Sequence, residues 1–154
     1  MEPVEVTSCV VYSLFVGLWT GSVLFVVLGV LPMARRGELN AAPLRSVAGT
    51  LRWVSRLSAV ALLLVGALIA AARYTGGPLT GTTGGQLVVG MVVPWGVLAG
   101  TVEVGTGRLR DGTERDKVRE PARGAWRLFL LAGAAAILLL VVAGLLGAWT
   151  VGYL

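Results

Sequence analysis

The sequence predicts an all-α integral membrane protein in which a single domain, residues 1–154, folds as a bundle of four transmembrane helices. Hydrophobic residues make up 56% of the chain and charged residues 14%, a balance that ordinary soluble domains do not have. The hydrophobic residues form four windows, each near the roughly 20 residues with which a helix crosses a bilayer. Of the 13 Lys and Arg residues, five lie between the first two windows and seven between the last two.

The first two helices are predicted at about residues 8–33 and 50–73. The segment before the first helix contains Glu2 and Glu5 but no basic residue. Because a secretory signal begins with positive charge, we expect this helix to remain in the protein. The apolar spacing from Leu44 onward is helical, which indicates that the second helix begins outside the hydrocarbon and runs inward.

The third and fourth helices are predicted at about residues 86–106 and 126–152. Pro94 lies in the middle of the third helix and predicts a kink, because proline removes a backbone donor. Between these helices, residues 106–125 carry opposite charges at helical spacing, which predicts a short exposed helix. Pro121 is expected to interrupt it.

The distribution of basic residues also predicts the orientation. Because positively charged loops stay in the cytoplasm, we expect both termini to be extracellular or periplasmic and the protein to be a multi-pass protein of the cell membrane. The basic residues flank apolar windows, so topology and lipid phosphates account for them and we expect no nucleic-acid partner. Interfacial aromatic residues are predicted at the outer boundary (Tyr74, Trp149, Tyr153) and the inner one (Trp53, Trp126).

One acidic residue, Glu103, falls inside a predicted span. An intramembrane carboxylate is a candidate functional group. Counted from the cytoplasmic edge, Glu103 on the third helix and Arg56 on the second reach similar depth, with Arg52 a turn away. The sequence therefore predicts an ion pair between Glu103 and Arg56, or failing that Arg52. We favour a structural role for this pair over proton or cation transfer.

Small residues mark predicted helix-packing faces. Lipid tails are as apolar as leucine, so membrane helices associate through close approach at small side chains. Small residues in all four helices predict a tight bundle, with a surface left over for a homo-oligomer or a larger membrane complex. The predicted packing positions are Gly17, Gly21, Gly66, Gly96, Gly100 and Gly144.

The residue types that most cofactors and catalytic sites need are scarce. The chain has no histidine and a single cysteine, Cys9, while Met33 and Met91 lie on different parts of the predicted fold. Copper(I) needs several sulfur ligands together, and haem needs an axial ligand that is usually histidine. We also find no nucleophile–base pair. We therefore expect no metal, no cofactor and no catalytic site, and a protein that is not an enzyme.

Five short motifs carry a resemblance to a known family. They are LWTGSVLF at 18–25, LP at 31–32, WVSRLS at 53–58, VG at 65–66 and GGQL at 84–87. They resemble the first three helices of the copper-resistance protein D (CopD-like) membrane domain. The family's early histidine is missing here, where Tyr12-Ser13-Leu14 stands, and so is its third-helix lysine, near Gly90-Met91. The resemblance implies the four-helix architecture, and it carries no copper-handling residue onto this chain.

These observations lead to two functional hypotheses. The first is a small, non-enzymatic membrane protein of the CopD-like type, transport-related or an accessory subunit of a membrane complex. The alternative is a self-sufficient transporter or channel for a metal ion or proton that acts as an oligomer. A pathway requires polar groups that face one another across the bundle interior, whereas an accessory role predicts an apolar interior and an apolar outer face.

Overall fold

The computed structural model describes residues 3–73, 81 and 83–151, almost all of them helical. The first rod comprises α1 (Pro3–Phe25), a π-helical turn η1 (Val26–Val30) and α2 (Leu31–Arg36). Three long helices follow and complete the four predicted spans. They are α3 (Ala41–Arg73), α4 (Thr83–Thr113) and α5 (Arg119–Val151). The all-α, four-span prediction is confirmed.

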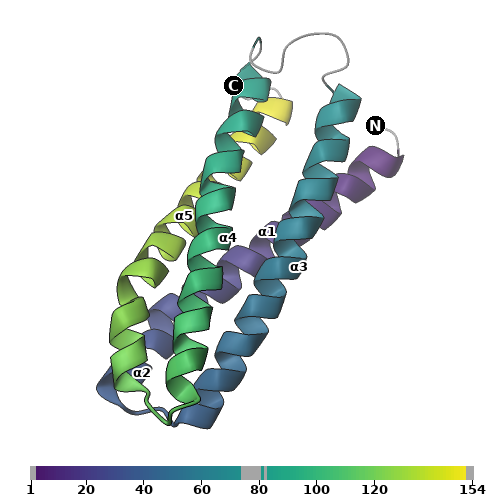
Figure 1. The fold of residues 1–154 in the computed structure, drawn as a ribbon. Coiled ribbons are helices and arrows are strands. Elements are labelled where there is room, and N and C mark those ends of the chain that lie inside the picture. The colour runs from purple at the N-terminus through teal and green to yellow at the C-terminus, as the bar shows by residue number, and fades with distance from the viewer. Residues whose placement is uncertain (1–2, 74–80, 82, 152–154) are drawn as a thin grey trace.

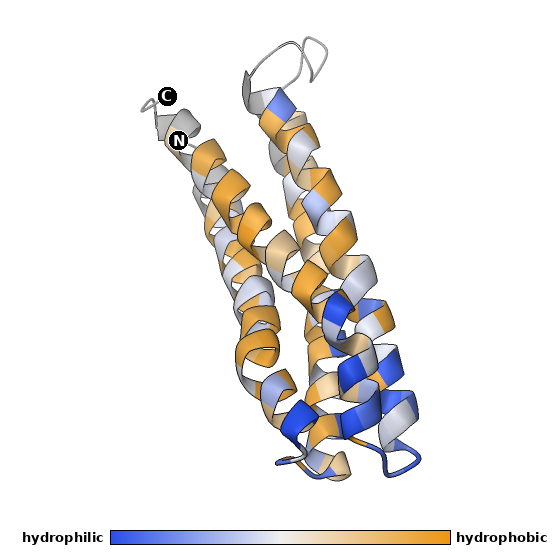
Figure 2. Ribbon diagram, turned by 90° about the vertical axis from the view of Figure 1, so that its left-hand side faces the viewer, coloured by the Kyte–Doolittle hydropathy of each residue, from blue (hydrophilic) through white to orange (hydrophobic). Residues whose placement is uncertain are grey.

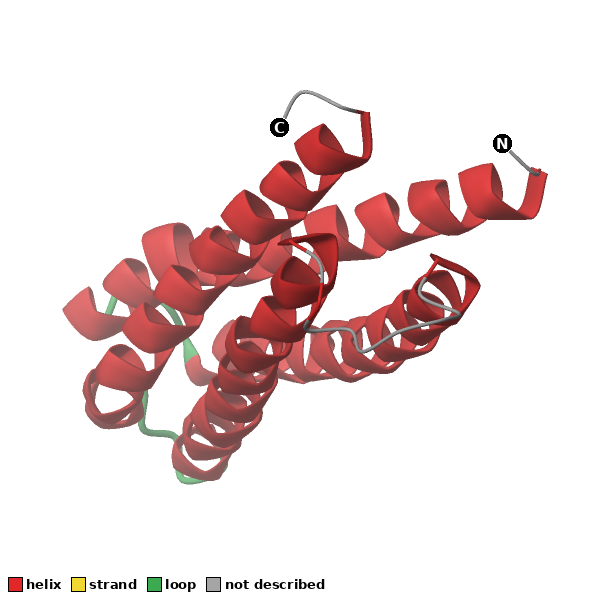
Figure 3. Ribbon diagram, turned by 90° about the horizontal axis from the view of Figure 1, so that it is seen from above, coloured by secondary structure: helices red, strands yellow, loops and turns green. Residues whose placement is uncertain are grey.

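The four rods form a bundle in which α4 packs between α3 and α5 (Figure 1). α1 packs against α3 and α5, and α2 packs against α5. The beginning of α1 and the end of α5 lie at the same end of the bundle (Figure 1), and the view from above shows them apart from each other (Figure 3). The two described connections, residues 37–40 and 114–118, lie at the opposite end.

Hydropathy divides the bundle along its length. Figure 2 shows hydrophilic residues gathered at the end with the two connections, which we call the polar end, and hydrophobic residues along the rest. All four rods are long and apolar enough to cross a membrane. The 33 residues of α3 give a helix of about 50 Å, longer than the ~30 Å hydrocarbon core. The protein is thus a multi-pass membrane protein whose helices continue past the hydrocarbon at the polar end.

The helix bounds correct the predicted ones at the polar end. α3 begins at Ala41 rather than near residue 50, α4 continues to Thr113 rather than 106, and α5 begins at Arg119 rather than 126. The separate exposed helix predicted within residues 106–125 is therefore wrong, because those residues extend α4 and α5 instead. Pro121 does not interrupt a helix. It lies in the first turn of α5, where a backbone donor is not needed.

The core of the bundle is apolar and closely packed. Trp19 and Phe129 are its largest fully buried side chains. α4 and α5 approach each other closely at two glycines, where a Cβ on Gly105 would lie 2.9 Å from the Phe129 ring and one on Gly112 2.5 Å from Pro121. Other core residues are Val23, Leu31, Leu98, Val102, Ala132 and Leu139.

The predicted packing glycines do not mediate these approaches. Gly66 alone among the six is in contact, with the Tyr12 ring 3.8 Å from the place of its Cβ. The other five meet no neighbour within this chain, because a small-residue spacing defines a helix face but not the neighbour which that face meets. Their role in helix packing stays a prediction. A Cβ would have no heavy atom within 4 Å at Gly17, Gly21, Gly96, Gly100 or Gly144.

Of the predicted interfacial aromatic residues, Trp53 and Trp126 both lie in the polar half of the bundle, Trp53 exposed and Trp126 partly buried. Tyr74 and Tyr153 and the side chain of Trp149 lie outside the described residues.

We expect the polar end to be cytoplasmic. In a Cys9→Ala background, a membrane-impermeant maleimide should label Gly81→Cys in intact cells and Glu114→Cys only after permeabilisation, because translocating the basic connections is disfavoured. Both positions are exposed, whereas Gly112 is unsuitable for such labelling because of its contact with Pro121. Labelling of Glu114→Cys in intact cells would contradict this orientation.

Candidate functional site: an ion triad between α3 and α4

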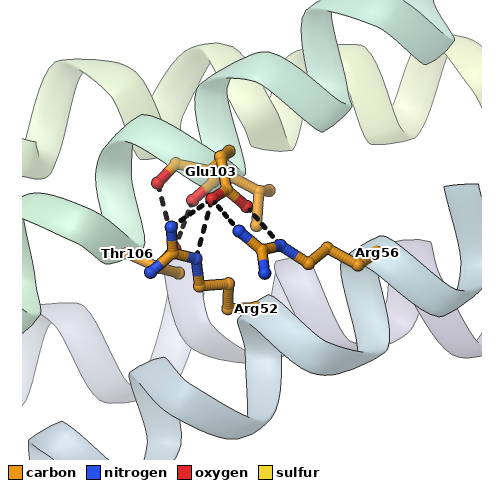
Figure 4. A network of polar contacts seen from close by, with 5 residues as sticks. Arg52, Arg56, Glu103 and Thr106 are labelled. Carbon is orange, nitrogen blue, oxygen red and sulfur yellow. Dashed lines mark hydrogen bonds and ion pairs between the residues drawn. The ribbon is translucent and has the colours of Figure 1, made fainter.

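The charged residues predicted to pair lie together between α3 and α4 (Figure 4). The two helices run antiparallel, so Arg52 and Arg56, one turn apart on α3, reach the level of Glu103 on α4. The Arg56 Nη2 lies 2.6 Å from Glu103 Oε1 and its Nε 3.1 Å from Oε2. The Arg52 Nε lies 2.7 Å from the same Oε1, and its Nη2 also contacts that oxygen. Glu103 thus joins both arginines rather than one of them.

The triad is only partly buried. The side chain of Arg52 is 27% exposed, that of Glu103 37% and that of Arg56 60%. The group therefore lies on the side of the bundle rather than in its interior. Its two guanidinium groups and one carboxylate leave one positive charge uncompensated. Both carboxylate oxygens already accept hydrogen bonds from cations, so this geometry holds α3 to α4 and does not offer Glu103 as a free cation ligand.

Three further polar contacts join the helices, the first of them at the level of the triad and the other two beyond it. The Trp19 indole N–H donates to Ser55 Oγ at 3.0 Å, and the Trp95 N–H donates to the Ala59 carbonyl at 3.3 Å. The Tyr12 hydroxyl donates to Met91 Sδ at 3.6 Å. The first contact joins α1 to α3, the second joins α4 to α3, and the third joins α1 to α4. In each, the donor is the polar tip of a mainly apolar side chain. Trp19 and Trp95 are packing residues.

Four hydroxyl groups of the membrane-spanning helices bond within their own helices. Ser13, Thr20, Ser22 and Thr101 each donate to a carbonyl of their own helix, over 2.6–2.9 Å. Such local bonds satisfy a hydroxyl without any interhelical partner. Sequence patterns gave no indication of one further buried hydroxyl, Ser58 Oγ, which has no hydrogen-bond partner among the described residues.

Within the described part of the chain, no three His, Cys, Asp or Glu residues lie close enough to hold a metal ion. Met33 is exposed on α2, whereas Met91 is buried on α4. No family model, no curated protein and no solved structure matches this chain. The CopD-like resemblance therefore stays a prediction.

Proposed function

We propose that this chain is a non-enzymatic membrane subunit of the CopD-like type, which packs against a partner in a transport-related membrane complex. The observation that carries the proposal is the low polarity of the bundle interior. Most core side chains are apolar, and the hydroxyl groups of Thr20, Thr101 and Thr106 donate to carbonyls of their own helices. An ion pathway would need polar groups that face one another across that interior.

The outer surface beside the triad supports an accessory role. Arg56 is largely exposed, and Gly96 and Gly100 lie on α4 two turns and one turn above Glu103, respectively, with open space around them. Small residues let another helix approach closely. The surplus positive charge of the triad favours a partner helix with a carboxylate at the same depth, because an unpaired charge there is costly. We call this surface the α3–α4 face.

Site-specific photo-crosslinking tests the proposal. A photoreactive side chain at Val60, one turn above Arg56 and 57% exposed, should give one adduct of defined mass in native membranes, and Arg56→Glu should reduce it. Ile137 on α5 is the matched control, because it is apolar and similarly exposed at 54%. Equal adducts from both positions would show that the α3–α4 face has no preferred partner.

The alternative, an oligomeric ion transporter or channel, has one observation in its favour: Glu103 lies in a membrane-spanning segment and is partly exposed. Purified protein in liposomes is expected to give proton and copper(I) flux no greater than protein-free liposomes. Flux that depends on Glu103 and is lost in Glu103→Gln would replace the subunit proposal by the transporter.

A further inference from the structure

A second cluster of arginines lies at the polar end, away from the triad. Pro32, Arg35 and Arg36 of α2 and Arg123 of α5 line an open pocket of about 280 Å³. Arg35 and Arg36 end the first rod, and Arg123 lies one turn into α5, so the pocket forms where these two helices emerge from the apolar zone. No sequence pattern indicated it, because its two walls are far apart in the chain.

The pocket carries an excess of positive charge. Arg36 has one acidic neighbour, Glu38, at 3.9 Å on the surface. Among the described residues, no carboxylate lies within ion-pair distance of Arg35 or Arg123. Three guanidinium groups thus share one exposed acid. Arginine guanidinium groups match the geometry of phosphate oxygens and bind them with two hydrogen bonds at a time.

Arg35 is held in place with one donor unused. Its guanidinium lies 4.3 Å from the centre of the Trp126 ring, a cation–π contact. Its Nε is buried and has no hydrogen-bond partner among the described residues. The cation–π contact therefore fixes one of the guanidinium groups that line the pocket.

The surroundings favour a lipid as the source of that oxygen. Pro32 gives the pocket an apolar wall. On α5, Leu130 and Leu131 lie about two turns above Arg123, toward the apolar zone, and are 45% and 55% exposed. Residues seven and eight apart share a helix face. A molecule with an anionic head in the pocket and acyl chains along α5 would match both the charged and the apolar surface.

We propose that this pocket binds the phosphate headgroup of an anionic phospholipid. Basic pockets between membrane helices are suited to this ligand, because the charge lies at headgroup depth. The phosphodiester oxygens receive hydrogen bonds from Arg35, Arg36 and Arg123, and Trp126 holds Arg35 from behind. This site is independent of the α3–α4 face and of the subunit proposal.

Binding to the purified full-length chain in neutral detergent tests the site, by native mass spectrometry with phosphatidylglycerol. Arg123→Gln and Arg36→Gln are each expected to weaken binding roughly tenfold, since each loses a charge-assisted contact. Both side chains are exposed, so the fold should be retained, and helical content by circular dichroism checks this. Arg115→Gln, an exposed arginine in the α4–α5 connection, removes the same charge outside the pocket and should bind like the unmodified chain.

Two further ligands show whether the pocket binds the phosphate of an anionic lipid or a free phosphate anion. Phosphatidylcholine, which has the phosphate but no net charge, should bind more weakly than phosphatidylglycerol, and inorganic phosphate should not displace the lipid. Equal binding in all three variants, or equal binding of the two lipids, would overturn the proposal. Inorganic phosphate that binds and displaces phosphatidylglycerol would instead identify a site for a free anion, and would overturn it as well.

Discussion

Replacing Glu103 with Gln is expected to destabilise the bundle by about 2 kcal/mol, less than the 3–5 kcal/mol of a fully buried pair because the triad is partly exposed. The substitution leaves Arg52 and Arg56 one turn apart on α3 with no counter-ion, and like charges at that spacing repel each other. Thermal unfolding of the purified protein in mild detergent measures the loss. Glu114→Gln, the same change at an exposed position in the α4–α5 connection, is the control.

The triad geometry also predicts an order of effects. Arg56→Gln should change stability little, as loss of an exposed ion pair does, because Arg52 still holds Glu103 through two nitrogens. Arg52→Gln should cost more, since its side chain is the least exposed of the three. The double variant Arg52→Gln, Glu103→Gln should recover part of the loss from Glu103→Gln. An Arg56→Gln variant as unstable as Glu103→Gln would contradict this account.

Trp19→Ala is expected to have the largest effect of any single core substitution, about 3–5 kcal/mol. Trp19 is fully buried in α1, and its removal leaves a cavity and deprives Ser55 of its donor. In a membrane the cost arises from lost packing contacts, because lipid is as apolar as the core. Thermal unfolding in mild detergent again provides the measurement.

Two control variants separate the causes. Trp53→Ala removes the same side chain from an exposed position of α3 and should change stability little. Trp19→Phe keeps most of the ring and loses the indole donor, so it should cost about 1 kcal/mol, the value of one hydrogen bond. If Trp19→Ala and Trp53→Ala unfold at the same temperature, Trp19 does not have the packing role described here.

The four spans were predictable because an uncharged apolar window of membrane length rarely forms anything other than a transmembrane helix. The extensions of the helices at the polar end were only partly predictable. Helical spacing from Leu44 indicated the early start of α3, and the structure extends it to Ala41. Helical charge spacing was present where α4 is extended, but it predicted a separate helix, because Gly105, Gly107 and Gly112 interrupt the apolar pattern. Two of these glycines are needed for the close approach of α5, which is a tertiary reason.

The ion triad and the arginine pocket also differ in how far the sequence predicts them. The neighbours of Glu103 followed from depth alone, since the rise per residue is constant in antiparallel helices. The rotation of each helix does not follow from depth, so the neighbour that each glycine face meets within the chain could not be predicted. The pocket lined by Arg35 and Arg123 depends on how α2 meets α5, and no local pattern encodes that contact.

The two-sided packing of the first rod has a consequence for biosynthesis. α1 contacts both α3 and α5, and α2 contacts α5, so the first rod completes its contacts only when α5 has been made. Exposure to lipid before then costs an apolar helix little, because lipid is as apolar as protein. Insertion of each helix can therefore precede assembly of the bundle.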